Sequence, residues 1–210
     1  MLSYMLNNRY FQEVPTTPTA MGKVVAVCGM PGSGKGEFAQ IMANHDVPVR
    51  SMGDMVRAEV AARSLDPSPT IFGEVAADLR AKYGEEVLAV RLADEVDNLL
   101  LSHAIVLIEG MRGTAEFDIF SNRWNSRFSS MAIVASKEIR FSRTQSRGRS
   151  EDGDYTQFEI REKREAGWGL MELINAADFT IKNEGSLEDL IYQSQTWLSN
   201  FSKNEFGNIH

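Results

Sequence analysis

The segment that most constrains the fold is Gly29–Gly36, which reads Gly-Met-Pro-Gly-Ser-Gly-Lys-Gly and directly follows the apolar run Val24–Cys28. An amphipathic stretch with Phe38, Ile41 and Met42 on one face comes after it. Glycines let the backbone turn with its amides pointing inward, and the N-terminus of the next helix adds partial positive charge. The lysine can reach the β and γ oxygens of a nucleotide. This phosphate-binding loop therefore predicts a strand, an anion site and a helix.

Composition sets the broad class of the protein. The chain has 210 residues, with 22 basic and 29 acidic side chains and a net charge of −7. This acidity argues against a nucleic-acid partner, which favours a basic face. The single cysteine, Cys28, excludes an internal disulfide and a cysteine-based zinc cluster. No apolar run reaches the roughly 20 residues that span a bilayer. We expect a cytoplasmic protein without a membrane partner, and its oligomeric state stays open.

The order of apolar segments indicates the architecture. Short apolar runs alternate with longer amphipathic stretches such as Glu85–Leu101, where apolar residues recur at helical spacing. Alternating strands and helices imply right-handed crossovers and a parallel sheet with helices on both faces. We predict a three-layer α/β/α fold with five strands, at Val24–Cys28, Val47–Val49, Ala104–Ile108, Met131–Ala135 and Phe179–Ile181.

The ends of the chain differ from its centre. Residues 1–20 contain Pro15-Thr16-Thr17-Pro18 and polar residues where a secretory signal needs an apolar core, so they are either a leader or linker, or an added segment that packs on a neighbour. The main domain is predicted over residues 21–195, with a small helical lobe at about 52–85 and a lid at about 147–164. Residues 196–210 are predicted to be a tail that frays after Phe201.

Two further segments follow predicted strands and resemble parts of adenylate kinases. Ser51–Arg57 resembles the S-T-G-D-M-L-R segment, where the arginine holds the phosphate of the accepting nucleotide. Asp54 would then cap a helix that carries Arg57. Ile108–Arg112 looks like the D-G-F-P-R-T segment, one residue shorter and with Glu109 for Asp. The resemblance implies that Glu109 holds magnesium through water and that Arg112 is a second clamp on the acceptor phosphate.

An arginine-rich stretch after the fourth predicted strand indicates a lid. Arg143 and Arg147 are one helical turn apart and could face the donor phosphates together, with Arg161 or Arg164 coming from the far side of the lid. Cations that close over the phosphates stabilise the transferred group and exclude water. The remaining basic residues are expected to lie in solvent, paired with nearby glutamates: Arg140, Arg149 and Lys163.

Two details concern the nucleotide itself. Where related loops have a magnesium-binding Ser or Thr after the lysine, this chain has Gly36 and then Glu37, which either reaches the water shell of the metal or favours the helix N-terminus. Ala177–Ser186 is similar to the loop beside the adenine in dephospho-CoA kinases and lacks the N-K-x-D that reads guanine. The predicted nucleotide-binding residues are Gly29, Pro31, Gly32, Ser33, Gly34, Lys35, Gly36, Glu37 and Asn183.

Over residues 21–195 the chain resembles a group of adenylate-kinase-related P-loop proteins, mostly archaeal. The resemblance lies in five segments: Gly29–Lys35, Asp54–Arg57, Glu109–Glu116, Arg149–Asp152 and Arg164–Gly169. The resemblance implies transfer of a phosphoryl group from ATP, with Mg²⁺, to a nucleoside monophosphate or similar small phosphate acceptor. A hydroxyl acceptor, with Asp54 as base, and a nucleotide-dependent switch are the alternatives. The implied catalytic residues are Lys35, Arg57, Arg112, Arg143, Arg147 and Arg164.

Overall fold

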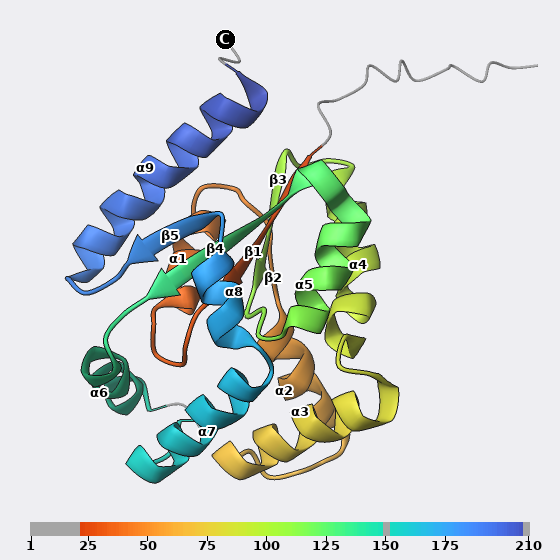
Figure 1. Ribbon diagram of the computed structural model, residues 1–210, viewed down its shortest axis with the longest axis vertical. Helices are drawn as coiled ribbons and strands as arrows, with labels where there is room; N and C mark the ends of the chain where they lie inside the picture. Colours follow the sequence, from red (N-terminus) through yellow and green to blue (C-terminus); the bar gives the residue numbers. More distant parts are fainter. Residues whose placement is uncertain (1–21, 149–151, 208–210) are drawn as a thin grey trace, which may run out of the picture.

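The computed structural model describes residues 22–148 and 152–207, so the predicted leader and Arg149 lie outside the described residues. Five parallel strands form one sheet in the order β2-β3-β1-β4-β5, with helices on both faces (Figure 1). The predicted three-layer α/β/α architecture is confirmed. The strands are β1 Lys23–Cys28, β2 Val49–Ser51, β3 Ile105–Glu109, β4 Phe128–Val134 and β5 Phe179–Lys182.

The central strand β1 explains why the apolar runs are continuous rather than alternating. It pairs with β3, where Val24 is opposite Val106, and with β4, where Val27 is opposite Met131. Helices cover both faces, so every residue from Val24 to Cys28 is fully buried. Helices α1 (Lys35–Ala43) and α9 (Leu187–Phe206) cover one face; the other is covered by α4 (Val87–Leu100), α5 (Thr114–Trp124) and α8 (Leu170–Ala176).

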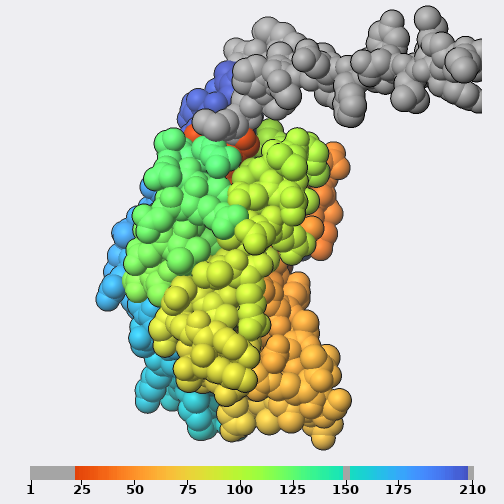
Figure 2. All heavy atoms as spheres, turned by 90° about the vertical axis from the view of Figure 1, so that its right-hand side faces the viewer, coloured from red at the N-terminus to blue at the C-terminus, as the bar shows by residue number. Residues whose placement is uncertain are grey.

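Two helical excursions extend from the carboxyl end of the sheet. The predicted small lobe consists of α2 (Met52–Ala62) and α3 (Pro69–Tyr83), and Ser68 caps α3 by accepting a hydrogen bond from the amide of Ile71. The described part of the segment predicted as a lid, about residues 147–164, consists of the end of α6 (Lys137–Arg147) and most of α7 (Tyr155–Gly167). Helix α3 contacts both α2 and α7 at one end of the molecule (Figure 2). The segments predicted as the lobe and the lid are therefore neighbours in space.

Two strand boundaries differ from the prediction. β2 begins at Val49 rather than Val47, whose buried side chain packs with α1 residues before the strand starts. β4 begins at Phe128 rather than Met131, because two serines hide its start in the sequence pattern. Ser130 is buried there, and its amide and hydroxyl both donate to the Asp178 carboxylate at 2.8 Å. Hydrogen bonding makes a polar residue acceptable inside the strand.

The C-terminal helix is longer than predicted. Fraying after Phe201 is wrong, since α9 continues to Phe206 and crosses the predicted boundary at residue 196. The Trp197 ring stacks on Phe201 with centroids 5.1 Å apart, and it also packs on Phe38 of α1. Aromatic burial thus stabilises the last turns. Among the described residues, no helix combines the length and apolarity that crossing a membrane requires.

Candidate functional site

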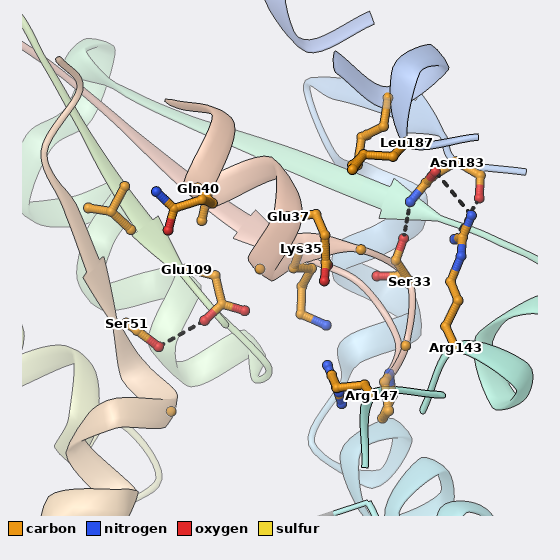
Figure 3. A pocket seen from close by; sticks show the side chains of 18 of the residues that line it. Ser33, Lys35, Glu37, Gln40, Ser51, Glu109, Arg143, Arg147, Asn183 and Leu187 are labelled. Atoms are coloured by element: carbon orange, nitrogen blue, oxygen red, sulfur yellow. Dashed lines mark hydrogen bonds between the residues drawn. The ribbon is translucent and has the colours of Figure 1, made fainter. Parts of the chain in front are cut away.

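A cleft of about 740 Å³ opens where the strands end at their carboxyl edge. Its walls come from the phosphate-binding loop, α1, α2, β3, the lid helices and the loop after β5 (Figure 3). Most of the residues predicted for the site line this cleft, including Lys35, Arg57, Arg112, Arg143 and Arg147. Segments far apart in the sequence therefore meet at one place.

Gly32 and Gly34 illustrate the geometric reasons for glycine in the phosphate-binding loop. Gly32 has φ +79°, and a Cβ there would lie 2.3 Å from the backbone oxygen of Arg140. Gly34 has φ +103°, and a Cβ there would lie 2.2 Å from Nδ2 of Asn183. Both the left-handed backbone and the close neighbour exclude a side chain. The loop is thus pressed against α6 and against the loop after β5.

Lys35, near the end of the phosphate-binding loop, is enclosed by the backbone of that loop. Its side chain is buried, and Nζ donates to the carbonyl oxygens of Gly29 at 2.5 Å and Met30 at 3.1 Å. Burial lowers the pKa of Lys35 to about 8, against the opposing effect of Glu109 and Glu165. The ammonium is therefore charged at neutral pH and ready to exchange a carbonyl partner for a phosphate oxygen.

Arg143 and Asn183 fix the loop after β5 to the phosphate-binding loop. The Asn183 side chain donates to the Ser33 carbonyl at 2.9 Å, and the backbone carbonyl of Asn183 accepts from Arg143 at 2.9 Å (Figure 3). Arg143 also donates to the Gly185 carbonyl at 3.1 Å. Both residues line the cleft as predicted, but they already perform a structural task there.

Arg140 corrects the sequence prediction. It was expected to lie in solvent, yet only 7% of it is exposed. Its guanidinium donates to the carbonyls of Pro31 at 3.2 Å and Ala135 at 3.0 Å, and it pairs with Glu162. The phosphate-binding loop packs directly on α6, which buries this side chain. Lys163 is exposed as expected.

Glu109 lies at the end of β3, in the position expected of an acid that acts on magnesium. The Ser51 hydroxyl donates to its Oε2 at 2.8 Å, and Glu109 lines the cleft near Lys35. Among the described residues, no three His, Cys, Asp or Glu side chains gather to form a metal cage. A single carboxylate beside a phosphate loop fits an ion held mostly by water and nucleotide oxygens. Glu37 is exposed in the first turn of α1 and lines the same cleft.

Asp54 and Arg57 form an ion pair at the entrance to the small lobe. Asp54 was predicted to cap the helix, but α2 begins at Met52 with Ser51 in the N-cap position. Asp54 instead accepts hydrogen bonds from Nε and Nη2 of Arg57, at 2.9 and 2.5 Å. Both side chains line the cleft. The helix therefore starts three residues earlier than predicted, and its first residue, Met52, is fully buried.

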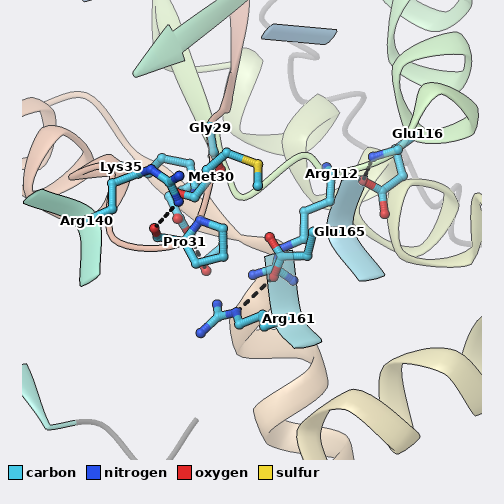
Figure 4. A network of polar contacts seen from close by, with 12 residues as sticks. Gly29, Met30, Pro31, Lys35, Arg112, Glu116, Arg140, Arg161 and Glu165 are labelled. Carbon is cyan, nitrogen blue, oxygen red and sulfur yellow. Dashed lines mark hydrogen bonds and ion pairs between the residues drawn. The ribbon is translucent and has the colours of Figure 1, made fainter. Parts of the chain in front are cut away.

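A buried carboxylate joins two cleft arginines (Figure 4). Glu165 of α7 is 2% exposed, its Oε1 accepts from Arg161 Nε at 2.9 Å, and its Oε2 lies 3.5 Å from Arg112 Nε. Burial alone would raise the pKa of Glu165, but Arg112, Arg161 and Lys35 outweigh it and lower the pKa to about 2. Glu165 is therefore ionised across the physiological pH range.

The charges continue into the lid. Arg147 donates to both carboxylate oxygens of Asp152, at 2.9 and 2.5 Å, and Asp152 is 4% exposed. Arg161 Nη1 lies 3.5 Å from Asp152 Oδ1. Alternating charges thus connect the end of α6, through α7, to the loop after β3. A bidentate arginine–carboxylate pair of this kind is geometrically specific.

Arg164 lies apart from the main cleft. It lines a second cavity of about 40 Å³ under the small lobe, together with Phe72 and Trp168. Burial lowers its pKa, and its guanidinium is 5.9 Å from the Trp168 ring centroid. A Cβ on Gly73 would lie 2.2 Å from Arg164 Nη1, so the guanidinium rests directly on α3. Arg164 connects the lid helix to the lobe.

Sequence reasoning missed the acids of the site. Asp152 and Glu165 both stand inside segments quoted for the resemblance, Arg149–Asp152 and Arg164–Gly169, yet roles were assigned only to arginines near them, such as Arg147 and Arg164. The available signal was their proximity to several arginines in an otherwise phosphate-binding region. Buried charges require partners, so arginines gathered in one site imply carboxylates among them.

The comparisons with known proteins agree with this fold. Residues 28–160 match a family described as an AAA domain. TT1252 from Thermus thermophilus aligns with a TM-score of 0.54 at 21% identity, covering 85% of this chain and 97% of that one. A shikimate kinase from Acinetobacter baumannii, in complex with shikimate, aligns with a TM-score of 0.52 at 16% identity, covering 89% and 97%. The predicted P-loop kinase-like fold is confirmed.

Relatives in archaea are more similar in sequence. A UPF0200 protein of Methanosarcina acetivorans is 38% identical over 184 residues, which are 87% of this chain and 97% of that protein. A UPF0200/UPF0201 protein of Archaeoglobus fulgidus is also 38% identical, over 87% of this chain, which spans 57% of that longer protein. The predicted likeness to a mostly archaeal group of P-loop proteins is thereby confirmed. The chain belongs to the UPF0200 family.

Proposed function

We propose that this protein transfers a phosphoryl group from ATP, with Mg²⁺, to a nucleoside monophosphate or a similar small molecule that already carries a phosphate. The proposal rests on one observation. A single cleft is lined both by the phosphate-binding loop with Lys35 and by the three arginines Arg57, Arg112 and Arg161. Two anionic groups brought into this cleft would meet between cations from both sides, as in-line phosphoryl transfer requires.

The residues divide into a donor set and an acceptor set. The loop amides and Lys35 would hold the donor phosphates, with Arg147 from the lid, while Arg57 and Arg112 would hold the acceptor phosphate. Bound Mg²⁺ would neutralise charge on the donor phosphates, and Glu109 would order its water. Preorganised cations in a closed site account for most of the catalysis in such reactions. The lid helices would exclude water, which otherwise takes the phosphoryl group.

The carboxylates favour a phosphate acceptor over a hydroxyl acceptor. A hydroxyl acceptor benefits from a general base, and Asp54 was the sequence candidate. Oδ1 of Asp54 accepts two hydrogen bonds from Arg57, so this oxygen is already paired with the guanidinium. Glu165, with a pKa of about 2, is a weak base. An ionised phosphate needs no base at all.

An acceptor panel tests the proposal directly. The protein is incubated with ATP and Mg²⁺ together with AMP, CMP, UMP, GMP, dephospho-CoA or no acceptor, and ADP release is measured. ADP that depends on one nucleoside monophosphate would establish the reaction and its substrate. Dependence on dephospho-CoA would redirect the assignment to hydroxyl transfer. ADP that forms equally without acceptor, or not at all despite ATP binding, would overturn the proposal in favour of a switch.

Variants of the acceptor arginines sharpen this test. Arg57→Ala or Arg112→Ala should raise the acceptor KM or lower kcat about ten-fold or more, since each removes a charged hydrogen bond worth about 1.5–3 kcal/mol. ATP affinity should stay nearly constant. Arg123→Ala is the matched control, because Arg123 pairs with Asp94 and Asp97 outside the cleft.

A further inference from the structure

The buried carboxylate of Glu165 is unexpected in a site built for phosphate. A negative charge beside a bound phosphate costs energy, and a buried charge is costly unless it is well paired. Glu165 is 2% exposed and fully ionised at neutral pH. A carboxylate in this position must therefore make a favourable contribution that offsets its repulsion with a bound phosphate.

The location of the carboxylate indicates that role. Arg112 and Arg161 line both the main cleft and the smaller cavity under the lobe, whereas Glu165 lines only the smaller cavity. Glu165 is thus outside the main cleft wall, in contact with arginines that belong to it (Figure 4). It engages each arginine on the Nε side. A carboxylate that competed with phosphate would be expected in the main cleft itself.

The two arginines come from different parts of the fold. Arg112 lies in the loop that follows β3 of the sheet, while Arg161 is on helix α7, one turn before Glu165. Two guanidinium groups near one another repel, and a carboxylate between them removes that repulsion. Arg112 Nε and Glu165 Oε2 are both buried without a hydrogen-bond partner among the described residues, and they face each other at 3.5 Å. A small movement of α7 would close this gap into a hydrogen bond.

We propose that Glu165 is a positioning residue that holds Arg112 and Arg161 together from behind, so that the sheet and the lid helix present one cationic surface to the phosphate of the acceptor. The inference rests on the proposed function for its biological meaning. The inference further implies that acceptor binding and the position of α7 are coupled through Glu165. A phosphate that draws Arg112 and Arg161 together would also shorten their contacts with the Glu165 carboxylate.

The test measures the binding of inorganic phosphate to the full chain saturated with ADP. Because ADP then occupies the phosphate-binding loop, phosphate binding reports on the site formed by Arg112 and Arg161. Binding is measured by calorimetry at about pH 6.5, where Lys35 stays protonated. Glu165→Gln should weaken phosphate binding about ten-fold, because the two arginines then repel each other and lose the group that holds them in place. ATP affinity of the nucleotide-free protein should change less than about three-fold.

Glu116→Gln is the matched control. Glu116 is a carboxylate with 1% exposure that pairs with Arg80 at 2.7 Å, and it lines neither cavity. The amide oxygen retained in this variant can still accept from the backbone of Arg112 and Gly113. We expect a similar loss of stability in the two Gln variants, but a loss of phosphate binding only in the Glu165 variant. Equal losses would reduce Glu165 to a structural role and overturn the inference.

A second variant covers the case in which Glu165→Gln does not fold. Glu165→Asp keeps the charge but shortens the side chain, so it should weaken phosphate binding by a smaller factor and restore most of the affinity lost in the Gln variant. Phosphate affinity that is unchanged or tighter in either variant would overturn the inference, since the carboxylate would then be a competitor of phosphate.

The two proposals fail differently. If the acceptor panel gives no turnover but phosphate binding depends on Glu165, the proposed function is wrong and the positioning role stands. If turnover depends on an acceptor while phosphate affinity is unaffected by substitution of Glu165, the positioning role is wrong and the proposed function stands. Absence of phosphate binding to the ADP-bound wild-type protein would overturn the positioning role directly.

Discussion

The two sides of the cleft are built by different means. On the donor side, the phosphate-binding loop is shaped by its own backbone, with Gly32 and Gly34 in left-handed conformations and pressed against α6 and Asn183. On the acceptor side, Arg112 and Arg161 come from distant segments and are held by Glu165. Backbone geometry is set by local sequence, whereas ion pairs depend on how elements dock. Substitutions on the donor side should therefore act by straining the backbone. Substitutions on the acceptor side should act by removing a charged partner.

Gly32→Ala is the most severe way to break the donor side. The variant combines a left-handed φ of +79° with a Cβ that would lie 2.3 Å from a backbone oxygen, which cannot move cheaply. We expect unfolding free energy to fall by about 2 kcal/mol or more and ATP binding to weaken about a hundred-fold. Gly207→Ala is the control, because its φ is +70° with no atom within 4 Å of the added Cβ. If both variants behave alike, strain rather than collision governs the loop.

Acid denaturation should probe the acceptor side. The pKa of Glu165 is lowered to about 2 in the fold from an ordinary 4.5, so its ionised form stabilises the folded state above about pH 4.5. That contribution should be lost as the pH falls from 4.5 to 2, on the order of 2–3 kcal/mol. The measurement compares unfolding free energies of the wild type and Glu165→Gln at pH 7 and pH 3. If the difference in unfolding free energy between the two proteins is as large at pH 3 as at pH 7, the charge of Glu165 does not stabilise the acceptor side.

Alkaline titration should probe the donor side. Burial lowers the pKa of Lys35 to about 8, so its positive charge is present below pH 8 and lost as the pH rises through that value. ATP affinity should then fall by up to about ten-fold between pH 7 and pH 9. Lys35→Met should bind ATP weakly at both pH values and show no such dependence. A wild-type affinity that is flat over this range would mean that Lys35 contributes no charge to binding.

Gly73→Ala is expected to have the smallest effect. The added Cβ would lie 2.2 Å from Arg164 Nη1, but a guanidinium is the flexible end of a side chain and can move. We expect a stability change of no more than about 1 kcal/mol and an acceptor KM raised about three-fold, since the lobe and lid would dock less closely. Ala76→Gly on the same helix provides a comparison for backbone effects. An unchanged acceptor KM would show that the contact between Arg164 and α3 does not affect acceptor binding.

The sequence predicts the donor side better than the acceptor side for a physical reason. Loop, strand and helix are contiguous in residues 23–43, so spacing alone indicates their structure. Arg140 shows where this stops: its burial depends on the loop packing on α6, more than a hundred residues along the chain. Glu165 likewise gains its role from Arg112 on another element. Ser130 concealed the start of β4 because its partner, Asp178, lies 48 residues further along the chain.

The single cysteine has a practical consequence. Cys28 ends β1 with no exposed surface, and burial raises the pKa of its thiol to about 11, so it is protonated and shielded from alkylating reagents. A cysteine introduced at an exposed lid position, such as Tyr155, would then be the one thiol that labels readily. A fluorophore placed there could report closure of the lid in real time, without removing any residue of the native interior.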